Sequence, residues 1–148
     1  MRHLFDAAAV DEVQERLARL RPDSEGVWGR MSAAQALAHC TAVMEEATGD
    51  RRPPRDLLGR LIGPLVKAHA FRKPMSRNVP TSPGLRVTDA RDFEAERRRL
   101  CATIDRFAAG GPAACTTHPH SFFGRLTPVE WATWQYKHLD HHLRQFGA

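Results

Sequence analysis

The segment from residue 127 to residue 146 most constrains the fold, because its periodicity is that of a helix with an unusual non-polar face. At roughly 100° per residue, its polar side chains fall within one arc of about 100°; these are Thr133, Lys137, Asp140, His141 and Arg144. His138 and His142 lie instead in the middle of the non-polar arc. The segment therefore predicts an amphipathic helix that turns two neighbouring histidines toward the protein interior.

Helical periodicity also runs through four earlier segments, and strand signals are almost absent. A serine N-cap and a glycine after the last periodic residue delimit the second of these segments. Thr127, Pro128 and Glu130 have the positions expected at the start of the last helix: N-cap, first helical residue and third residue of a capping box. The predicted helices cover residues 6–20, 32–48, 56–70, 89–109 and 127–146.

The predicted third helix differs from the others. Gly63 and Pro64 interrupt it, and residues 72–88, which follow it, contain three prolines and predict a long extended connection over the surface. Four amphipathic helices plus one accessory helix indicate an all-α, four-helix bundle in a single domain over residues 1–148. The long connection permits neighbouring helices that do not follow each other in the chain.

Composition restricts the class of protein. The 148 residues are 42% hydrophobic and 26% charged, as in a soluble globular domain, and no run of about 18 apolar residues predicts a membrane span. The N-terminus has no signal-peptide pattern, so we expect a cytoplasmic protein. Three scattered cysteines form neither a disulfide framework nor a Cys-x-x-Cys pair. The net charge of +5 comes from dispersed arginines without a nucleic-acid motif, which argues against a nucleic-acid partner.

The inward pair of histidines has the spacing of a metal site. Residues four apart on a helix have Cβ atoms about 6 Å apart, so His138 and His142 can reach one metal ion at about 2.0–2.1 Å. A third protein ligand is expected, and His39, in the middle of the second predicted helix at the edge of its apolar stripe, is the best candidate. The alternative is that His39 is a core histidine hydrogen-bonded to a neighbour.

Four further residues are candidates for contact with a substrate. Arg97 falls within the apolar stripe of its helix. Either its stem packs while its head reaches water, or it receives a carboxylate, from the glutamates at 45 and 46 or from a substrate. His120 lies in the loop that leads into the last helix, where Phe123 is also placed to form the wall of a pocket, and Trp131 follows in the first turn of that helix. For the aromatic residues the alternative is core packing.

Motifs at both ends of the chain carry a family resemblance. The segment from Trp28 to Ser32 precedes a helix that carries His39, and the His120-x-Phe-Phe-Gly motif precedes a last helix with His138-x3-His followed by Gln145. Together these motifs resemble the DinB-like (YfiT-like) metalloenzyme superfamily, and within it an uncharacterised branch, over about residues 6–147. Ser121 departs from the branch, which has proline at that position.

The resemblance implies a four-helix bundle that binds one divalent metal ion through three histidines, which carry over onto His39, His138 and His142. Zinc and nickel are the first candidates, and three histidines also suit iron or copper. Characterised relatives are transferases or isomerases that use low-molecular-weight thiols, and many are dimers. The resemblance therefore implies a small-molecule substrate, a low-molecular-weight thiol cosubstrate and a homodimer.

The favoured function is a thiol-dependent transferase that acts on a small electrophilic substrate through the three-histidine metal centre. Arg97 or an arginine of the 51–60 cluster would receive a carboxylate of the thiol. One alternative is metal-assisted hydrolysis, for which Glu46 is the candidate general base. The other is a non-catalytic helical bundle with a metal-binding or stress-response role.

Overall fold

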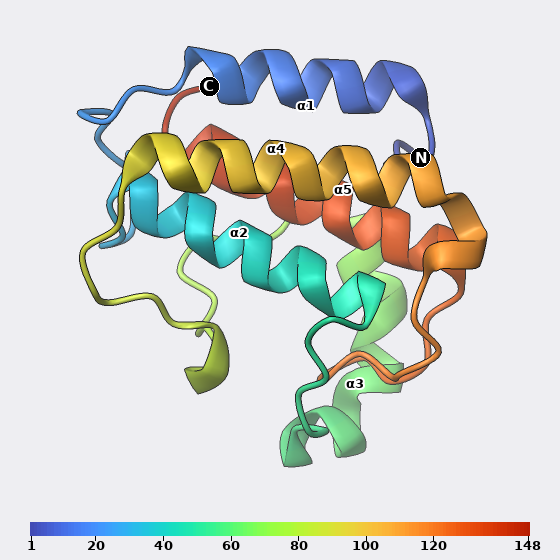
Figure 1. The fold of residues 1–148 in the computed structure, drawn as a ribbon. Coiled ribbons are helices and arrows are strands. Elements are labelled where there is room, and N and C mark those ends of the chain that lie inside the picture. Colours follow the sequence, from blue (N-terminus) through green and yellow to red (C-terminus); the bar gives the residue numbers. More distant parts are fainter.

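The computed structural model describes residues 1–148 and consists of helices joined by loops (Figure 1). The only strand-like feature is a single bridge between His120 and Gly124. The all-α prediction is therefore confirmed. The helices are α1 (Ala7–Arg19), α2 (Ala33–Thr48), α3 (Leu57–Arg72), α4 (Phe93–Gly110) and α5 (Pro128–Gln145), with two short 3-10 helices, η1 (Pro83–Leu85) and η2 (Gly111–Ala114).

Side-chain caps set the helix boundaries. Ser32 at the start of α2 and Thr127 at the start of α5 each form a capping box with the side chain three residues later, as predicted. Helix α4 begins at Phe93 rather than at the predicted residue 89, because Asp92 is its N-cap and accepts a hydrogen bond from a backbone N–H of the first turn. Local sequence therefore determines where these helices begin.

Helices α1, α2, α4 and α5 form a four-helix bundle. Helix α2 packs against α4 and α5, and α1 packs against the same two helices. The colours of Figure 1 show that α2 and α4 run in one direction while α1 and α5 run in the other. Parallel neighbours need a connection that returns along the length of a helix, about 24 Å for 16 residues. Helix α3 and the loop after it provide this connection, so the contact between non-consecutive helices that the long connection permits is present.

The apolar core fills the space between these four helices. It contains 22 buried side chains, of which Leu100, Ile104, Phe107 and Trp131 are among the largest that are fully buried. Burial of each such side chain stabilises the fold by about 1.5–3 kcal/mol relative to exposure. The packing of α2 against α5 also brings together the inner faces on which the candidate histidines lie.

Helix α3 lies outside the bundle and packs on the loop that precedes α5 (Figure 1). Its only buried residues are Gly59 and Gly63, and a Cβ at Gly63 would lie 2.1 Å from the carbonyl oxygen of Phe122, so this approach requires glycine. Pro64 lies inside the helix and does not end it, which corrects the predicted interruption. The residue before a proline is restricted by steric clash, and Gly63 relieves that clash because it has no Cβ.

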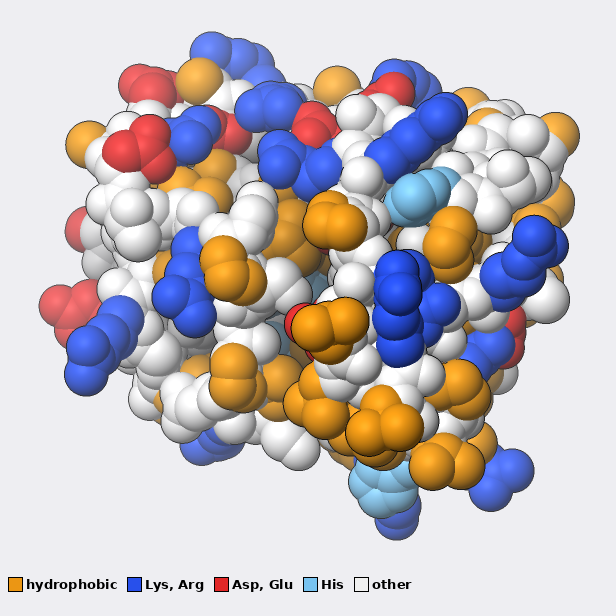
Figure 2. Space-filling view, turned by 90° about the horizontal axis from the view of Figure 1, so that it is seen from below, with side chains coloured by type: hydrophobic (Ala, Val, Ile, Leu, Met, Phe, Trp, Pro, Cys, Tyr) orange, Lys and Arg blue, Asp and Glu red, His pale blue; other side chains and the backbone are white.

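The outer face of α3 is apolar and exposed to solvent. Figure 2 shows hydrophobic side chains gathered on the face of the molecule that carries α3. The exposed leucines of this helix are Leu57, Leu58, Leu61 and Leu65, each more than half exposed. None of the helices combines the length and the apolar character that a membrane crossing requires.

Candidate metal centre

Three imidazoles meet between α2 and α5. His39 comes from the middle of α2, and His138 and His142 come from successive turns of α5. The Nε2 atoms of His39 and His138 are 3.1 Å apart, and the three ring centroids lie 4.6–5.0 Å from one another. One ligand nitrogen from each residue falls within 4.8 Å of the others. The structure therefore brings together the three histidines that the sequence singled out, and their group could hold a metal ion.

A backbone carbonyl orients the imidazole of His39. The Nδ1 atom of this ring lies 2.9 Å from the carbonyl oxygen of Leu85, in the 3-10 helix η1. A carbonyl oxygen only accepts hydrogen bonds, so the ring proton of His39 is on Nδ1. This N–H group donates a hydrogen bond to the Leu85 carbonyl. The Nε2 lone pair then faces the other two histidines. This is the arrangement of a metal-binding histidine, in which an outer acceptor fixes the tautomer and the ring orientation.

Gln145 gives His142 the same arrangement. Nδ1 of His142 lies 2.8 Å from Oε1 of Gln145, and Nε2 of Gln145 donates to the carbonyl of Trp28 at 2.8 Å. The bond to Trp28 fixes which end of the amide faces the histidine, so Nδ1 of His142 is the donor and its Nε2 keeps a free lone pair. Gly29 allows this contact, because a Cβ there would lie 2.4 Å from the Gln145 amide nitrogen.

His138 is the least satisfied of the three. Its Nδ1 atom is buried and has no hydrogen-bond partner. Since the proton of His39 is on Nδ1, the 3.1 Å contact between the two Nε2 atoms requires that His138 donate from Nε2. A buried polar group without a partner costs about 1–3 kcal/mol. Three neutral imidazoles that converge in this way fit a divalent cation, because the cation would accept the Nε2 lone pairs of His39 and His142 and, with the His138 proton on its unpartnered Nδ1, that of His138 as well.

Burial keeps all three imidazoles in the neutral form. Desolvation lowers the pKa of His39 and lowers that of His142 to about 3, with a further contribution from the nearby His39. The pKa of His138 is lowered well below its ordinary value by desolvation and by the neighbouring histidines. Neutral imidazole is the form that binds metals, so the site is ready for an ion at neutral pH.

Three residues predicted to contact a substrate, His120, Phe123 and Trp131, lie beside the candidate metal centre. Their side chains are largely buried in the core. His120 accepts hydrogen bonds at Nδ1 from the backbone N–H groups of Phe122 and Phe123, at 3.0 and 3.2 Å. Its ring stacks on Phe123 at 4.8 Å and contacts Trp131 and Trp134. Phe123 is 7% exposed and Trp131 is 1% exposed. In this conformation His120 holds the loop in place, and Phe123 and Trp131 pack against the rings around them.

Arg97 has a local partner. Its guanidinium group lies 2.6 Å from the Glu94 carboxylate, in the same helix, and 5.6 Å from the centre of the Phe93 ring. The prediction that Glu45 or Glu46 supplies its carboxylate is therefore corrected, because a glutamate three residues away lies within reach of the same side chain. Arg99 is the residue of this helix that pairs with Glu45, at 2.5 Å.

Glu46 is a buried acid on the inner side of α2. It is 3% exposed, and its Oε1 atom has no hydrogen-bond partner. Burial raises the pKa of its carboxyl group to about 7, while the nearby Arg51 acts in the opposite direction. It follows His39 by seven residues, which is two helical turns, and so lies on the same face of α2. Both protonation states of this side chain are therefore accessible near neutral pH.

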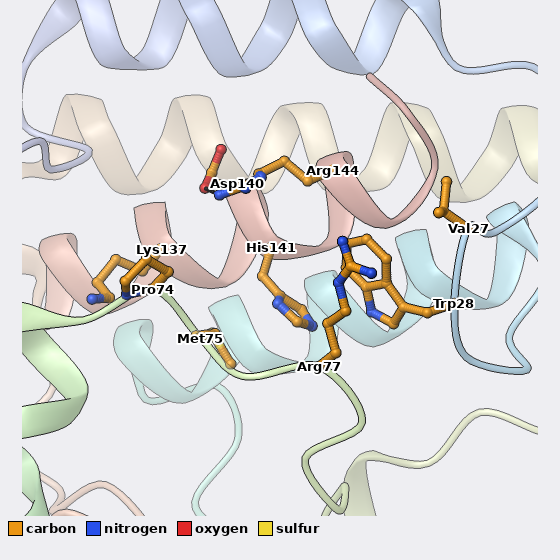
Figure 3. A pocket seen from close by; sticks show the side chains of 9 residues that line it. All are labelled: Val27, Trp28, Pro74, Met75, Arg77, Lys137, Asp140, His141 and Arg144. Carbon is orange, nitrogen blue, oxygen red and sulfur yellow. Dashed lines mark ion pairs between the residues drawn. The ribbon is translucent and has the colours of Figure 1, made fainter.

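Two openings lead toward the site. Figure 2 shows a hollow in the face that carries α3, with histidine atoms visible at its floor. Beside the centre, a pocket of about 180 Å³ includes His141, Trp28 and Met75 in its wall (Figure 3). Arg77 lies over the Trp28 ring at 4.3 Å in this pocket. His141 points into the pocket (Figure 3), and its ring centroid lies 5.0 Å from that of His142.

The outer-shell groups were harder to identify from the sequence than the imidazoles. Gln145 follows His142 by three residues, which is a recognisable helical spacing. The carbonyls of Leu85 and Trp28 carry no side-chain signal, because any residue type offers a backbone oxygen. Only the folded connection between α3 and α4 brings Leu85 to His39.

Comparison with known proteins gives a family. No curated protein and no solved structure matches the chain. A family described as protein of unknown function (DUF1569) matches residues 2–148, a range that includes all three histidines, Leu85 and Gln145. The chain therefore belongs to the DUF1569 family.

Proposed function

We propose that the protein is a divalent-metal-dependent enzyme, most specifically a thiol-dependent transferase that acts on a small electrophilic substrate. The observation that carries the proposal is the outer hydrogen bonding of the site. Leu85 and Gln145 each hold an Nδ1–H group, so the Nε2 lone pairs of His39 and His142 face a common point next to His138. A core histidine needs only one partner, whereas this arrangement prepares several lone pairs for one cation.

His39, His138 and His142 would hold the ion, with zinc or nickel as the first candidates and iron or copper as further ones. A divalent ion on three neutral imidazoles supplies a Lewis acid that lowers the pKa of a thiol or a water toward neutrality. The chain itself contributes orientation and exclusion of water. The rings of Phe123 and Trp131 pack around His120, and we propose His120, Phe123 and Trp131 as the residues that limit the space for a substrate.

A second candidate function is metal-assisted hydrolysis. Glu46 supports it, because a buried carboxyl group whose pKa is raised to about 7 has the properties of a general base or acid at neutral pH. Replacement of Glu46 by Gln should abolish hydrolysis of an activated ester and leave thiol transfer unchanged if the two chemistries are separable. Loss of thiol transfer in the same variant would assign Glu46 to the transferase.

The first test is elemental analysis of tag-free protein purified without added metal. We expect about one equivalent of a divalent metal per chain and its loss in His138→Ala, because two imidazoles rarely hold an ion tightly. His69→Ala is the matched control, since His69 is exposed on α3. Absence of metal, with no rise in the melting temperature on addition of zinc or nickel, would instead indicate a non-catalytic bundle.

The activity test pairs low-molecular-weight thiols with small electrophiles and measures loss of free thiol. Turnover by the loaded protein, absent in folded His138→Ala, would support the transferase. A homodimer is also part of the proposal, and sedimentation of the purified protein gives its mass directly.

A further inference from the structure

A second pocket lies on the other side of the segment that orients His39. It has a volume of about 210 Å³ and is formed between α2, the segment 84–87 and the start of α4. Its floor contains Ala38 and Ala42, whose small side chains leave the space open. Four of its nine lining residues are arginines, namely Arg51, Arg86, Arg91 and Arg99.

Two of these arginines form short ion pairs with carboxylates. Arg91 contacts Asp89 and Glu96, each at 3.1 Å, and Arg99 contacts Glu45 at 2.5 Å. These ion pairs hold the guanidinium groups at the rim in defined positions. They set three carboxylates against four guanidinium groups, so the pocket keeps an excess of one positive charge while the buried Glu46, which lies near Arg51, is protonated.

The other two arginines have unused hydrogen-bond donors. Arg86 makes no ion pair, and its Nε donates to the carbonyl of Thr81 at 3.1 Å. Arg51 reaches Glu45 and the carbonyl of Gly84 only at 3.5 and 3.4 Å, and its buried Nε has no partner. A guanidinium group has five N–H donors in a planar fork that matches an oxyanion. Arg51 and Arg86 therefore present donors to the pocket that the protein does not satisfy.

We propose that this pocket binds the carboxylate or phosphate group of a small anionic ligand, with Arg51 and Arg86 as the donors. An oxyanion between them satisfies the free N–H groups and neutralises the excess charge. The binding is inferred from the arginines alone. Its use as the anchor for the anionic end of a substrate or cosubstrate rests on the proposed function.

The wall between the two sites couples them. Residues 84–87 line the pocket, and the carbonyl of Leu85, within this segment, accepts a hydrogen bond from the Nδ1–H group of His39. An anion that links Arg51 to Arg86 would hold residues 84–87 against α2. It would thereby also hold in place the Leu85 carbonyl that orients the His39 ring. Coupling between two binding sites is reciprocal, so the anion and the metal should each increase the affinity for the other.

The test is titration calorimetry of the full chain with inorganic phosphate and, separately, with the dicarboxylate succinate, at constant ionic strength set with chloride. We expect one saturable site per chain, and the tighter of the two probes identifies the group. Arg86→Gln should weaken binding about tenfold, the typical effect of losing a charge-assisted hydrogen bond. Ala42→Leu should also weaken it, because the added side chain fills the floor without changing the charge.

Arg98→Gln is the matched control, because Arg98 is an exposed arginine of the same helix as Arg99 and does not line the pocket. We expect it to change the affinity less than twofold. An equal loss in Arg98→Gln and Arg86→Gln would indicate diffuse attraction of anions and overturn the proposal. Absence of saturable binding by either probe in the wild-type protein would also overturn it.

The same titration separates this inference from the proposed function. In His138→Ala the pocket is unchanged, so anion binding should persist although the metal is lost. If the anion binds but the protein shows no enzymatic activity, the pocket is an anion site and only its proposed role in catalysis is wrong. Complete loss of anion binding in a folded His138→Ala variant would overturn the proposal, because coupling to the metal site changes the affinity of the pocket and does not create it.

Discussion

Helices α5 and α3 have similar lengths, and they distribute their polar and apolar side chains in opposite ways. Helix α5 buries His138 and Gln135, with exposed fractions of 4% and 0%. Helix α3 exposes Leu61 and Leu65, at 76% and 78%. The comparison shows that side-chain polarity alone does not decide burial in this protein. Position in the bundle decides it, and a buried polar residue then needs a partner or an ion.

The physical difference lies in what each helix packs against. Helix α5 has α1 on one side and α2 on the other, so most of its circumference is covered. Its buried polar groups are only partly paired: Nε2 of Gln135 donates to the carbonyl of Val43 at 3.0 Å, whereas Oε1 of Gln135 and Nδ1 of His138 have no hydrogen-bond partner. Helix α3 contacts a loop through glycines, and no second helix covers its leucines.

Truncation of a leucine should give the largest difference in the free energy of unfolding between the bundle and the accessory helix α3. Leu100→Ala should lower the free energy of unfolding by about 2–5 kcal/mol, because Leu100 is fully buried and truncation leaves a cavity. Leu61→Ala should change it by less than about 0.5 kcal/mol, since its side chain is already exposed. Urea denaturation of both variants makes the measurement. A large loss in Leu61→Ala would mean that α3 is covered in solution, as it would be in a dimer through this face.

Acidification should destabilise the bundle through its buried imidazoles. Burial lowers the pKa of His120 to about 4, from an ordinary value of 6.5. The unfolded chain therefore takes up the proton first as the pH falls, so the stabilising contribution is complete above about pH 6.5 and is lost by about pH 4. A shift of this size corresponds to about 3 kcal/mol from this residue.

Denaturation of metal-free protein at several pH values measures this effect. His120→Gln should reduce the slope of stability against pH between about 4 and 6.5, while His69→Gln on exposed α3 should not change it. An unchanged slope in His120→Gln would show that this imidazole is solvated in the native state.

Gln145→Ala should weaken metal binding without removing a ligand. Loss of an outer-shell partner typically lowers metal affinity by about 10–100-fold, and Gln145 is the acceptor that orients His142. Competition with a chelator of known affinity gives the dissociation constant for the metal. Gln14→Ala is a suitable control, because Gln14 bonds to α4 far along the bundle from this contact. Equal metal affinities of Gln145→Ala and the wild-type protein would show that the hydrogen bond from His142 to Gln145 does not prepare the site for a metal ion.

Gly63→Ala tests how independent α3 is. The added Cβ would meet the Phe122 carbonyl at 2.1 Å, and overpacking of this kind costs about 1–3 kcal/mol. We expect faster hydrogen exchange in α3 and the loop before α5, with little change in α1 and α4. Gly84→Ala is the control, because nothing lies within 4 Å of its Cβ position. Global loss of protection in Gly63→Ala would show that α3 is part of the cooperative core.

Much of the fold could be predicted from local signals. The capping residues Ser32 and Thr127 mark helix starts through bonds to their own first turns, which need no tertiary context. The prediction was less accurate at two points, although the signals there are also local. Asp92 caps α4 later than expected, and Pro64 is accommodated inside α3 because a glycine precedes it.

The candidate site divides in the same way. His138 and His142 were visible together because a helical period relates them, and His39 was identified by its place on an apolar stripe and by family resemblance. For Arg97 the sequence left open a head group in water or a carboxylate from Glu45, Glu46 or a substrate, whereas Glu94 in its own helix provides the carboxylate. The arginine pocket could not be anticipated, because Arg51, Arg86 and Arg99 come from three segments with no common spacing.

The sequence by itself determined the five helices, the inward direction of two histidines on α5 and the excess of basic residues, because these depend on periodicity, capping and composition. Tertiary structure alone decided that His39 meets that pair, that Leu85 and Gln145 fix the imidazole protons, and that Arg51 and Arg86 share a pocket beside them. The reason is that a tautomer or an anion site depends on the distance between groups remote in the chain. That distance is set by how α2, α5 and the long connection pack together.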